Sequence, residues 1–455
     1  MTATVQGPIT GGTHGRPFGR PLVDLDALGV DESEYVLEGE ATSYRLVGEQ
    51  TRDGRWTAAP ASTAPFRTRL VVYRPRDAAH FNGTVVVSWN NVTAGYDLFG
   101  GESLEMIEGG YAFVGVTTQK VGIVGLPPMN QGLASWDPER YGSLSHPGDD
   151  YSFDIYTQAA RAVGRDRPRD SVDPLGGLDV RHVVAMGGSQ SAGRLATYIN
   201  AVHPLTEAFD AYLPTIWFGA GTPLEVGDAV VNINAPQPDV SRRLLRGSHQ
   251  LRDDLGVKIF VVNSELESMP CYDVRQPDTD TFRYWEAAGT CHVSAQSMAV
   301  RAPKYERDFG TALPVMERMN RIPLMPLYDA ALHHIQRWLL DGTAPPVQPR
   351  IEFRDGDPAE IVRDEHGIAL GGIRLPQADV PIATNSAVPL ANDIFSILYG
   401  SCVPFPVEKV RALYGDRATF LARFEESARA AEKAGVLLPR DVDAAIEEAG
   451  AAYPD

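Results

Sequence analysis

The sequence predicts an α/β fold in which helices cover both faces of a mostly parallel central sheet. The first observation is that short apolar, β-branched runs alternate with segments of helical spacing along most of the chain. The second is composition, because 455 residues with 43% hydrophobic and 22% charged side chains are enough for a large core. The third is that no repeat of fixed period occurs, which excludes solenoids and propellers.

The first part of the chain supplies strands of two kinds. Two early strands, over 35–46 and 66–73, are expected to be partly antiparallel. They are followed by a buried strand at 83–89, a short helix at 103–108, a second buried strand at 111–116 and a helix at 151–163. Asp149 and Asp150 stand near the start of this last helix, where negative charge suits the helix dipole.

The alternation continues in the second part. A strand at 179–186 leads at once into a Gly-rich turn and a helix that runs through Tyr198. Later elements are strands at 211–218, 257–262 and 282–287 and a helix at 327–340. Because strands and helices take turns, we expect most of these strands to be parallel.

Changes in composition and in the pattern of predicted elements divide the chain into three parts. Residues 1–34 form an N-terminal segment, and 35–345 form the sheet domain, which we expect to be catalytic. Cap-like insertions are expected in this domain at about 221–255 and 293–323, where Leu, Val, Met and Pro are typical of an apolar pocket or of simple cover. Residues 346–455, with short β pieces and charged helices, form a C-terminal extension packed on the domain.

Charge and hydropathy limit the partners. Asp and Glu outnumber Lys and Arg by 59 to 41, so the net charge is −18 and repels phosphate backbones and anionic membranes. No apolar run approaches the 18 or so residues of a membrane span, and 1–20 contain no apolar signal. We therefore expect a cytoplasmic protein with no nucleic-acid partner and no membrane partner. The oligomeric state is not predicted.

Three cysteines are too few and too scattered for a disulfide scaffold or a zinc cluster. They are Cys271, Cys291 and Cys402, and we expect reduced thiols. A bond between Cys271 and Cys291 stays open, although a reducing compartment disfavours it. No H-E-x-x-H or other ligand spacing appears, so we expect no metal and no cofactor.

The segment around Ser189 carries the sharpest chemical signal. A nucleophile elbow places a strained serine between a strand and a helix and needs small residues two before and two after it. Gly187 and Ser191 meet this need, although the usual residue at the second position is glycine. A plain Gly-rich turn is the alternative interpretation. A phosphate loop is disfavoured because neither G-x-G-x-x-G nor G-K-[ST] is present.

A serine nucleophile needs a base and an acid, which such folds supply in the chain order Ser, Asp/Glu, His. The strand at 257–262 leads to Glu265 and Glu267, and the strand at 282–287 leads to His292. We favour Glu267 as the acid, with Glu265 as the alternative or as its supporting partner. His333 and His334 lie in a helix of apolar periodicity and are expected to pack or to face solvent.

Two backbone N–H groups are expected to hold an oxyanion. The Gln190 N–H follows the serine at a helix N-terminus, where partial positive charge gathers. The second should come from the loop after the strand at 83–89, from Asn91 or Val92. Asn90-Asn91 could equally be only a turn.

Several segments together resemble the α/β-hydrolase superfamily, in its bacterial "alpha/beta hydrolase domain" subgroup of esterase-like proteins. The segments are Phe81-Asn82-Gly83-Thr84-Val85-Val86-Val87 through Asn91-Val92, Trp136-Asp137-Pro138-Glu139-Arg140-Tyr141-Gly142, His146-Pro147-Gly148-Asp149-Asp150-Tyr151-Ser152, Gly188-Ser189-Gln190-Ser191, Arg275-Gln276-Pro277-Asp278, Trp285-Glu286-Ala287-Ala288-Gly289-Thr290-Cys291-His292 and Gly371-Gly372-Ile373-Arg374-Leu375-Pro376. The resemblance implies an α/β-hydrolase fold, a Ser189 nucleophile, a His292 base and a carboxylate near Glu267. It also implies that serine at 191 is normal, whereas Cys291 departs from an expected small residue.

These observations predict a serine hydrolase that cleaves small-molecule carboxylic esters through an acyl-enzyme with a Ser-Glu-His triad. A lactonase or amidase would use the same triad. A lyase or acyltransferase on the same fold and a non-catalytic binding protein are the remaining alternatives.

Overall fold

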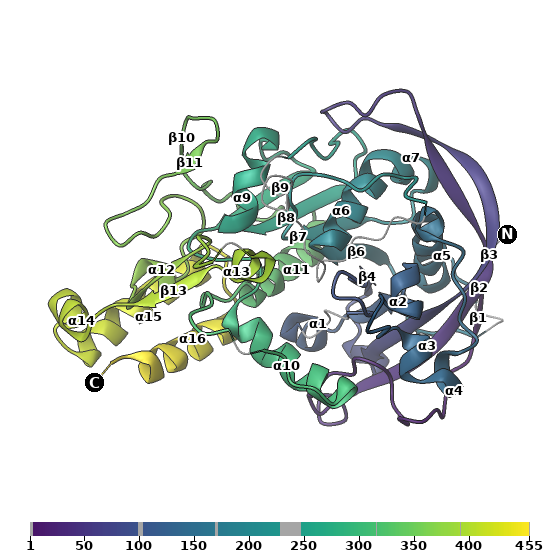
Figure 1. The fold of residues 1–455 in the computed structure, drawn as a ribbon, viewed down its shortest axis with the longest axis horizontal. Helices are drawn as coiled ribbons and strands as arrows, with labels where there is room; N and C mark the ends of the chain where they lie inside the picture. Colours follow the sequence, from purple (N-terminus) through teal and green to yellow (C-terminus); the bar gives the residue numbers. More distant parts are fainter. Residues whose placement is uncertain are drawn as a thin grey trace. The chain divides into compact units, whose positions relative to one another are not determined.

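The computed structural model describes residues 3–98, 103–168, 172–227, 247–314, 316–391 and 393–454. The chain divides into two compact units, one formed by Met1–Pro238 with Ser248–Ile259 and the other by Asp239–Gly247 with Phe260–Asp455. Figure 1 labels the helices and strands of both units. Of the expected insertion at 221–255, residues 228–246 lie outside the described residues.

The first unit contains a mixed sheet in the order β1-β2-β3-β5-β4-β6-β7. Its strands are β1 (Thr4–Gln6), β2 (Val30–Val47), β3 (Thr57–Pro75), β4 (Thr84–Trp89), β5 (Ala112–Val116), β6 (His182–Gly188) and β7 (Ala211–Thr215). The pairs from β1 to β3 and from β3 to β5 are antiparallel, and β4 pairs in parallel with β5 and β6, as β6 does with β7. The expected early antiparallel strands and the parallel strands after them are therefore present.

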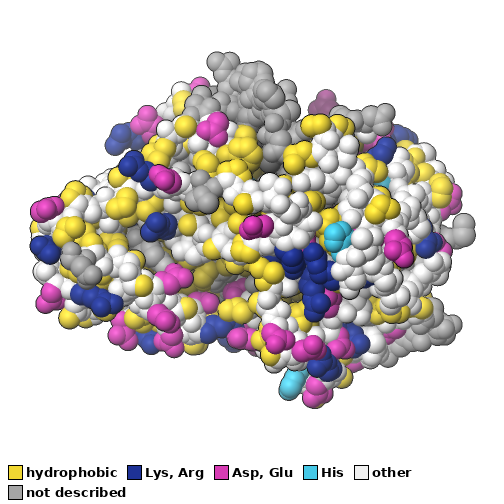
Figure 2. Space-filling model, turned by 60° about the horizontal axis from the view of Figure 1, so that its bottom comes forward, with side chains coloured by type: hydrophobic (Ala, Val, Ile, Leu, Met, Phe, Trp, Pro, Cys, Tyr) yellow, Lys and Arg dark blue, Asp and Glu magenta, His cyan; other side chains and the backbone are white. Residues whose placement is uncertain are grey.

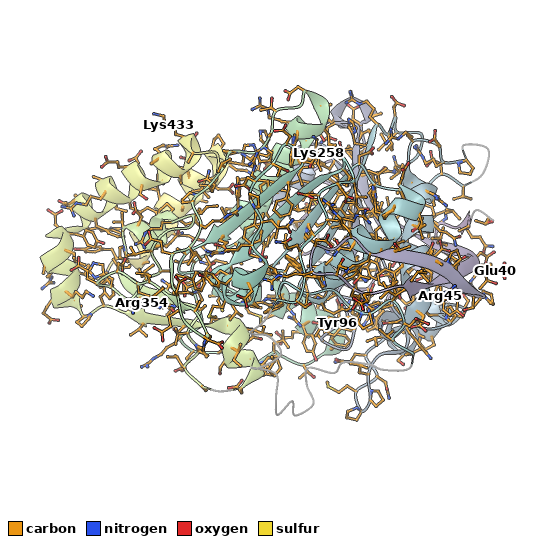
Figure 3. All side chains as sticks on the ribbon, turned by 90° about the horizontal axis from the view of Figure 1, so that it is seen from above. Glu40, Arg45, Tyr96, Lys258, Arg354 and Lys433 are labelled. Atoms are coloured by element: carbon orange, nitrogen blue, oxygen red, sulfur yellow. The ribbon has the colours of Figure 1, made fainter. Side chains whose placement is uncertain are left out.

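Burial explains why the central strands are the apolar ones. Every residue of β4 and β5 is buried, as parallel strands covered on both faces require. The β2–β3 hairpin is longer than predicted because its outer half, where Figure 3 labels Glu40 and Arg45 on β2, is polar and partly exposed. Long antiparallel strands can keep one face in water, so apolar runs mark only their inner halves.

The helices of the first unit lie between its strands in the chain. They are α1 (Leu104–Glu108), α2 (Lys120–Val124), α3 (Leu133–Trp136), α4 (Pro138–Tyr141), α5 (Ser152–Val163), α6 (Gln190–Thr197) and α7 (His203–Thr206), with short helical turns η1 (Ala78–His80), η2 (Asp149–Tyr151) and η3 (Tyr198–Val202). Helix α5 contacts β2 and β4, and α6 contacts β6 and β7. Tyr156 of α5 donates its hydroxyl to the Val87 carbonyl at 2.6 Å and so fixes α5 against β4.

Buried charges link β2 and β3 to the segment that contains Asp97. The side chain of Arg69 on β3 is fully buried and pairs with Glu34 on β2 and with Asp97, which are also fully buried. Burial lowers the pKa of Arg69, but the neighbouring carboxylates raise it by more. Arg140 and the Tyr141 hydroxyl also donate to Glu34, so the buried charges are paired and hydrogen-bonded.

In the second unit, β8 (Lys258–Ser264), along which the chain passes from one unit to the other, lies beside β9 (Phe282–Ala287). Its helices are α9 (Glu265–Cys271), η4 (Tyr272–Val274), α10 (Ala295–Phe309) and α11 (Met325–Leu340). Helix α10 begins at the Ser294 cap inside the expected insertion at 293–323. Most residues of α10 are half-buried and the helix contains Pro303, so its sequence lacks the clear apolar periodicity of a buried helix.

The C-terminal extension follows α11 in the same unit. It contains β10 (Phe353–Arg354), β11 (Glu360–Ile361), α12 (Pro376–Asp379), β12 (Ala383–Ser386), α13 (Ile394–Tyr399), β13 (Ser401–Pro404), α14 (Val407–Tyr414), α15 (Arg417–Lys433) and α16 (Pro439–Ala452). Helices α15 and α16 lie side by side around a core that includes Phe420, Phe424 and Ala449 (Figure 1). A β-bridge from Ala287 to Ile373 joins the extension to β9.

Two surface properties bear on partners. On the face drawn in Figure 2, acidic side chains are scattered over the surface, with basic ones between them. None of the helices in the described ranges is both long and apolar enough to cross a membrane.

Candidate active site

The backbone of Ser189 is strained. It stands between β6 and α6 with φ 61° and ψ −121°, a conformation that non-glycine residues rarely adopt. Its N–H donates to the Thr215 carbonyl on β7 at 3.0 Å, and its side chain makes no capping hydrogen bond to α6. The elbow therefore holds the serine in a fixed backbone conformation and leaves its hydroxyl uncommitted to the helix.

Small side chains are needed on both sides of this serine. A Cβ atom added at Gly187 would lie 3.1 Å from Cβ of Ser191 and 3.1 Å from Leu195 Cδ1, tighter than ordinary contacts. Ser191 is fully buried, so its hydroxymethyl group fits the elbow without enlarging it. The predicted pattern of small residues two before and two after Ser189 thus has a direct steric cause.

Free backbone donors follow the serine. The first hydrogen bond of α6 runs from the Gly193 N–H to the Ser189 carbonyl, so the Gln190 N–H has no partner within the helix. The expected role of the Asn91 N–H as an oxyanion donor is not met, because this N–H already donates to the Leu98 carbonyl at 3.2 Å. The Asn91 amide side chain instead donates to the Gly188 carbonyl at 3.1 Å and ties this loop to the elbow. Of the two expected donors, the Val92 N–H is the one left.

A polar network that sequence reasoning missed supports Gln190. Its Nε2 donates to Gln119 Oε1 at 2.9 Å, and Gln119 Nε2 donates to Asp149 at 2.8 Å. Asp149 also accepts from the buried Arg194 of α6 at 3.1 Å. Asp149 is thus more than the helix-dipole residue that its position suggests. The only signal in the sequence is its place in the familial segment at 146–152.

The expected base and acid meet in the second unit. Nδ1 of His292 lies 2.7 Å from Oε1 of Glu267, and the two side chains are 5% and 0% exposed. Oε2 of Glu267 accepts from the Ser264 N–H at 3.1 Å and from the Ser264 hydroxyl. Ser264 and Glu267 form a capping box at the start of α9, so the helix terminus itself fixes the carboxylate.

Glu265, the alternative acid, is engaged elsewhere. Its carboxylate accepts from Arg363 Nη2 and from the Gly289 N–H at 2.7 Å each. It accepts further hydrogen bonds from the Ala387 N–H and the Ser386 hydroxyl. Glu265 therefore joins α9 to the loop after β9 and to the C-terminal extension.

The remaining expected residues have simpler surroundings. All three cysteines are buried thiols outside any disulfide of the described residues. Burial raises the pKa of the Cys271 and Cys291 thiols, which keeps them protonated and unreactive. His334 pairs with the Gly435 carbonyl at 2.8 Å as a packing residue. In the described ranges no cluster of three or more His, Cys, Asp or Glu could hold a metal ion.

An apolar cavity begins three residues after His292. Its volume is about 460 Å³, and it lies between α10 and the segment at 313–319, both in the second unit. The wall includes Ala295 and three flexible apolar side chains, Met298, Met316 and Met319. Since three residues span at most about 11 Å, this wall starts close to the histidine.

A strand–serine–helix elbow on a largely parallel sheet, followed in the chain by a carboxylate and a histidine, is the arrangement of the α/β hydrolases. The model of the family described as "Alpha/beta hydrolase domain" matches residues 5–447, so the chain belongs to that family. No match was found among curated proteins.

Among solved structures, the chain is similar to several esterases at low identity and low TM-score. An esterase called Est22, solved with p-nitrophenol, is 10% identical with a TM-score of 0.30, over 58% of this chain and 74% of that chain. Brefeldin A esterase, described as a bacterial homologue of human hormone-sensitive lipase, is 13% identical with a TM-score of 0.27, over 59% and 72%. Acetyl xylan esterase from Paenibacillus sp. R4 is 13% identical with a TM-score of 0.26, over 60% and 83%.

Proposed function

We propose that this protein is a serine hydrolase that cleaves carboxylic esters of small molecules through an acyl-enzyme. Ser189 is the nucleophile, His292 the general base and Glu267 the acid that orients the imidazole. The observation that carries the proposal is the 2.7 Å hydrogen bond between His292 Nδ1 and Glu267 Oε1, because an acid that holds Nδ1 orients the imidazole as a Ser-Glu-His triad requires.

The chemistry follows from these roles. Ser189 Oγ attacks the ester carbonyl as His292 Nε2 takes its proton, and the imidazolium then gives this proton to the departing alcohol. Water next attacks the acyl-serine, loses a proton to His292 and releases the carboxylic acid, after which Ser189 recovers its proton. The N–H groups of Gln190 and Val92 stabilise the oxyanion in both steps.

The elbow supports the assignment of Ser189 as the nucleophile, and the capping box supports the assignment of Glu267 as the acid. The strained backbone at Ser189 is a cost of about 1 to 3 kcal/mol that a plain turn would avoid. Glu267 is buried and has one oxygen on the histidine and the other on Ser264, so the imidazole has a fixed partner. The cavity lined by three methionines beside α10 favours an apolar acyl or alcohol group in the substrate.

The test is labelling of the full chain with a fluorophosphonate, read by intact mass, together with turnover of short-chain p-nitrophenyl esters. We expect one label per chain in the wild type and none in Ser189→Ala, with Ser191→Ala as the matched control that keeps its label. His292→Ala should lose labelling and turnover, whereas His333→Ala should lose neither.

The alternatives give different results. A wild-type protein that folds but takes no label contradicts the triad and favours a binding protein on the same fold. Labelling without ester turnover, but with turnover of lactones or amides, keeps the triad and changes the substrate. Product that depends on an added alcohol acceptor indicates an acyltransferase.

A further inference from the structure

One buried amide in the first unit joins the two segments that carry the proposed oxyanion donors. Gln119, which directly precedes α2, is 2% exposed. Its Oε1 accepts from Trp89 Nε1 at 3.1 Å and from Gln190 Nε2 at 2.9 Å. Trp89 ends β4 three residues before Val92, and Gln190 directly follows Ser189. A single oxygen atom therefore links the end of β4 to the nucleophile elbow.

Asp149 determines which way this amide faces. Its Oδ2 accepts from Gln119 Nε2 at 2.8 Å, and its Oδ1 accepts from the Lys120 N–H at 2.9 Å. An amide has an acceptor on one side and donors on the other. Turning the Gln119 amide over would set its donors against the N–H groups of Trp89 and Gln190 and its oxygen against a carboxylate. The carboxylate thus holds the Gln119 oxygen toward the elbow.

Both ends of the link are firmly packed. Trp89 is 1% exposed, and its ring centroid lies 4.9 Å from that of Tyr156 and 5.6 Å from that of Phe153. Its buried N–H needs an acceptor, because a buried donor without a partner is costly. On the other side, Arg194 of α6 donates to Asp149 at 3.1 Å. Helix α6 is therefore tied to the same carboxylate by a second contact.

We propose that Gln119 is a positioning residue that sets the separation of the Gln190 N–H and the Val92 N–H, the two oxyanion donors. The inference rests on the proposed function, because it assigns Gln119 a task in that reaction. Gln119 acts through Trp89 and Gln190 and does not touch the substrate. Oxyanion donors work only at hydrogen-bond distance, and a displacement of about 1 Å can lower the rate about a hundredfold.

The test is steady-state kinetics of the full chain with p-nitrophenyl butyrate and with its thiono analogue, in which sulfur replaces the carbonyl oxygen. Sulfur is larger than oxygen and a weaker acceptor, so the oxo-to-thiono ratio of kcat/KM reports how well the donors fit the oxyanion. Gln119→Leu keeps the approximate size and removes the acceptor. It should lower kcat for the oxygen ester about tenfold to a hundredfold, change KM less than about threefold and shrink the ratio.

A second variant breaks the link from the elbow side. Gln190→Met removes the side-chain donor at a half-buried position and keeps the backbone N–H, so it is expected to fold. It should lower kcat and shrink the oxo-to-thiono ratio in the same way. The double variant with Gln119→Leu should be no slower than Gln119→Leu alone, because both substitutions break the same link.

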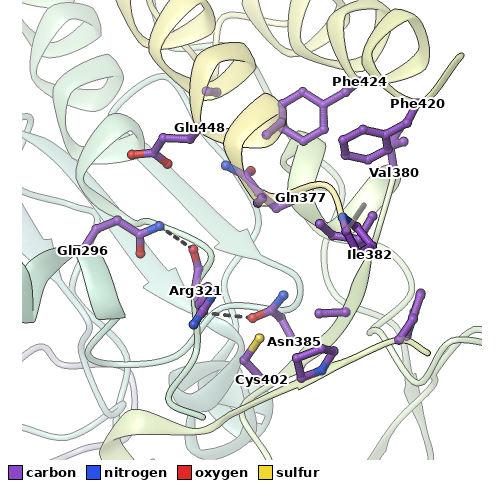
Figure 4. A pocket seen from close by; sticks show the side chains of 17 residues that line it. Gln296, Arg321, Gln377, Val380, Ile382, Asn385, Cys402, Phe420, Phe424 and Glu448 are labelled. Atoms are coloured by element: carbon purple, nitrogen blue, oxygen red, sulfur yellow. Dashed lines mark hydrogen bonds between the residues drawn. The ribbon is translucent and has the colours of Figure 1, made fainter. Parts of the chain in front are cut away.

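Two other glutamines serve as controls. Gln158 of the first unit is also buried, and its Nε2 donates to Asp154 at 2.7 Å and to the Glu40 carbonyl at 2.9 Å. Gln158→Leu should lower the free energy of unfolding in urea, as Gln119→Leu does, but keep the wild-type oxo-to-thiono ratio. Gln377 lines a cavity of about 330 Å³ in the C-terminal extension (Figure 4), and Gln377→Leu should also keep the ratio.

The inference is overturned if Gln119→Leu keeps the wild-type kcat, or if it loses kcat with an unchanged oxo-to-thiono ratio, as a merely structural residue would. It is also overturned if the losses of the two single variants multiply in the double variant. If Gln119→Leu fails to fold, Gln190→Met decides by the same criteria. Failure of the proposed function is distinct, because the wild type itself would then show neither ester turnover nor a fluorophosphonate label, and this inference would fall with it.

Discussion

Glu267 Oε1 lies 2.7 Å from His292 Nδ1, while Glu265, two residues earlier on the same turn of α9, makes an ion pair with Arg363 at the same distance. Two adjacent buried carboxylates thus serve two partners. The split arises because Ser264 caps α9 and draws Glu267 back over the helix N-terminus. Glu265 instead accepts from the Gly289 N–H and from the extension.

This split predicts opposite effects for two matched substitutions. Glu267→Gln should lower kcat for p-nitrophenyl esters about a thousandfold or more, because a neutral amide no longer stabilises the imidazolium. Glu265→Gln should keep most of the activity but lower the free energy of unfolding by about 1 to 3 kcal/mol, because it weakens the pair with Arg363. Ester kinetics and urea unfolding on both variants measure the two effects. Loss of kcat in a stably folded Glu265→Gln protein would reverse the assignment.

The elbow predicts a stabilising substitution next to the nucleophile. The Ser191 hydroxyl is fully buried and has no hydrogen-bond partner in the described part of the chain. Ser191→Ala removes this unpaired group without changing the small size that the turn needs. We expect the free energy of unfolding to rise by about 1 kcal/mol with fluorophosphonate labelling intact. Gly187→Val, which collides with Ser191 and Leu195, should lower it by about 1 to 3 kcal/mol. Urea unfolding of both variants measures these changes. A destabilised Ser191→Ala protein would contradict the inference that the Ser191 hydroxyl is buried without a partner.

The fold could be predicted where burial leaves a simple pattern. The strand expected at 282–287 has those bounds as β9, and β4 and β5 each begin one residue later than predicted, because fully buried strands are apolar runs between polar turns. The outer hairpin of β2 and β3 lacks this contrast. Helix α9 was not predicted, because it directly follows the apolar run of a strand. The spacing of Ser264 and Glu267 is nevertheless that of a capping box and could have indicated the helix start.

The candidate site could be proposed from the sequence only where its residues follow strands in order. Ser189, Glu267 and His292 each follow a strand, so topology points to them. The support of Gln190 by Gln119 depends on positions 71 residues apart that no local pattern relates. Likewise, whether the Asn91 N–H is free depends on the return of the chain to Leu98, which folding alone decides.

A buried histidine predicts acid sensitivity in the first unit. Burial lowers the pKa of His249 from 6.5 to about 4, and the neutral ring accepts from the Gly221 N–H and stands edge-on to Trp56. The unfolded chain binds this proton below about pH 6.5 and the folded chain only below about pH 4, so stability falls between these values as pH is lowered. The shift corresponds to about 3 kcal/mol.

Four other histidines also have lowered pKa values and add to the loss of stability at low pH: His146, His182, His203 and His334. The contribution of His249 is therefore measured as the difference in pH-dependent stability between the wild type and a His249 variant. We expect His249→Asn to lose less stability than the wild type between pH 7 and pH 4 in urea unfolding. Parallel pH profiles for the two proteins would show that another group causes the acid sensitivity.

The buried ion cluster of Arg69, Glu34 and Asp97 predicts a large loss of stability for a shape-conserving substitution of Arg69. Arg69→Met leaves the buried Asp97 without this guanidinium and removes one of the two guanidinium partners of the buried Glu34, which keeps Arg140. We expect a loss of about 3 to 5 kcal/mol in the free energy of unfolding at pH 7. Because the Asp97 carboxylate can take up a proton, the loss should shrink at pH 5, in contrast to the acid sensitivity at His249. The double variant Arg69→Met with Asp97→Asn should recover part of the stability, since it removes the buried carboxylate that has lost its guanidinium. A double-mutant cycle in urea at both pH values measures the coupling, and strictly additive losses would mean that the pair contributes nothing beyond packing.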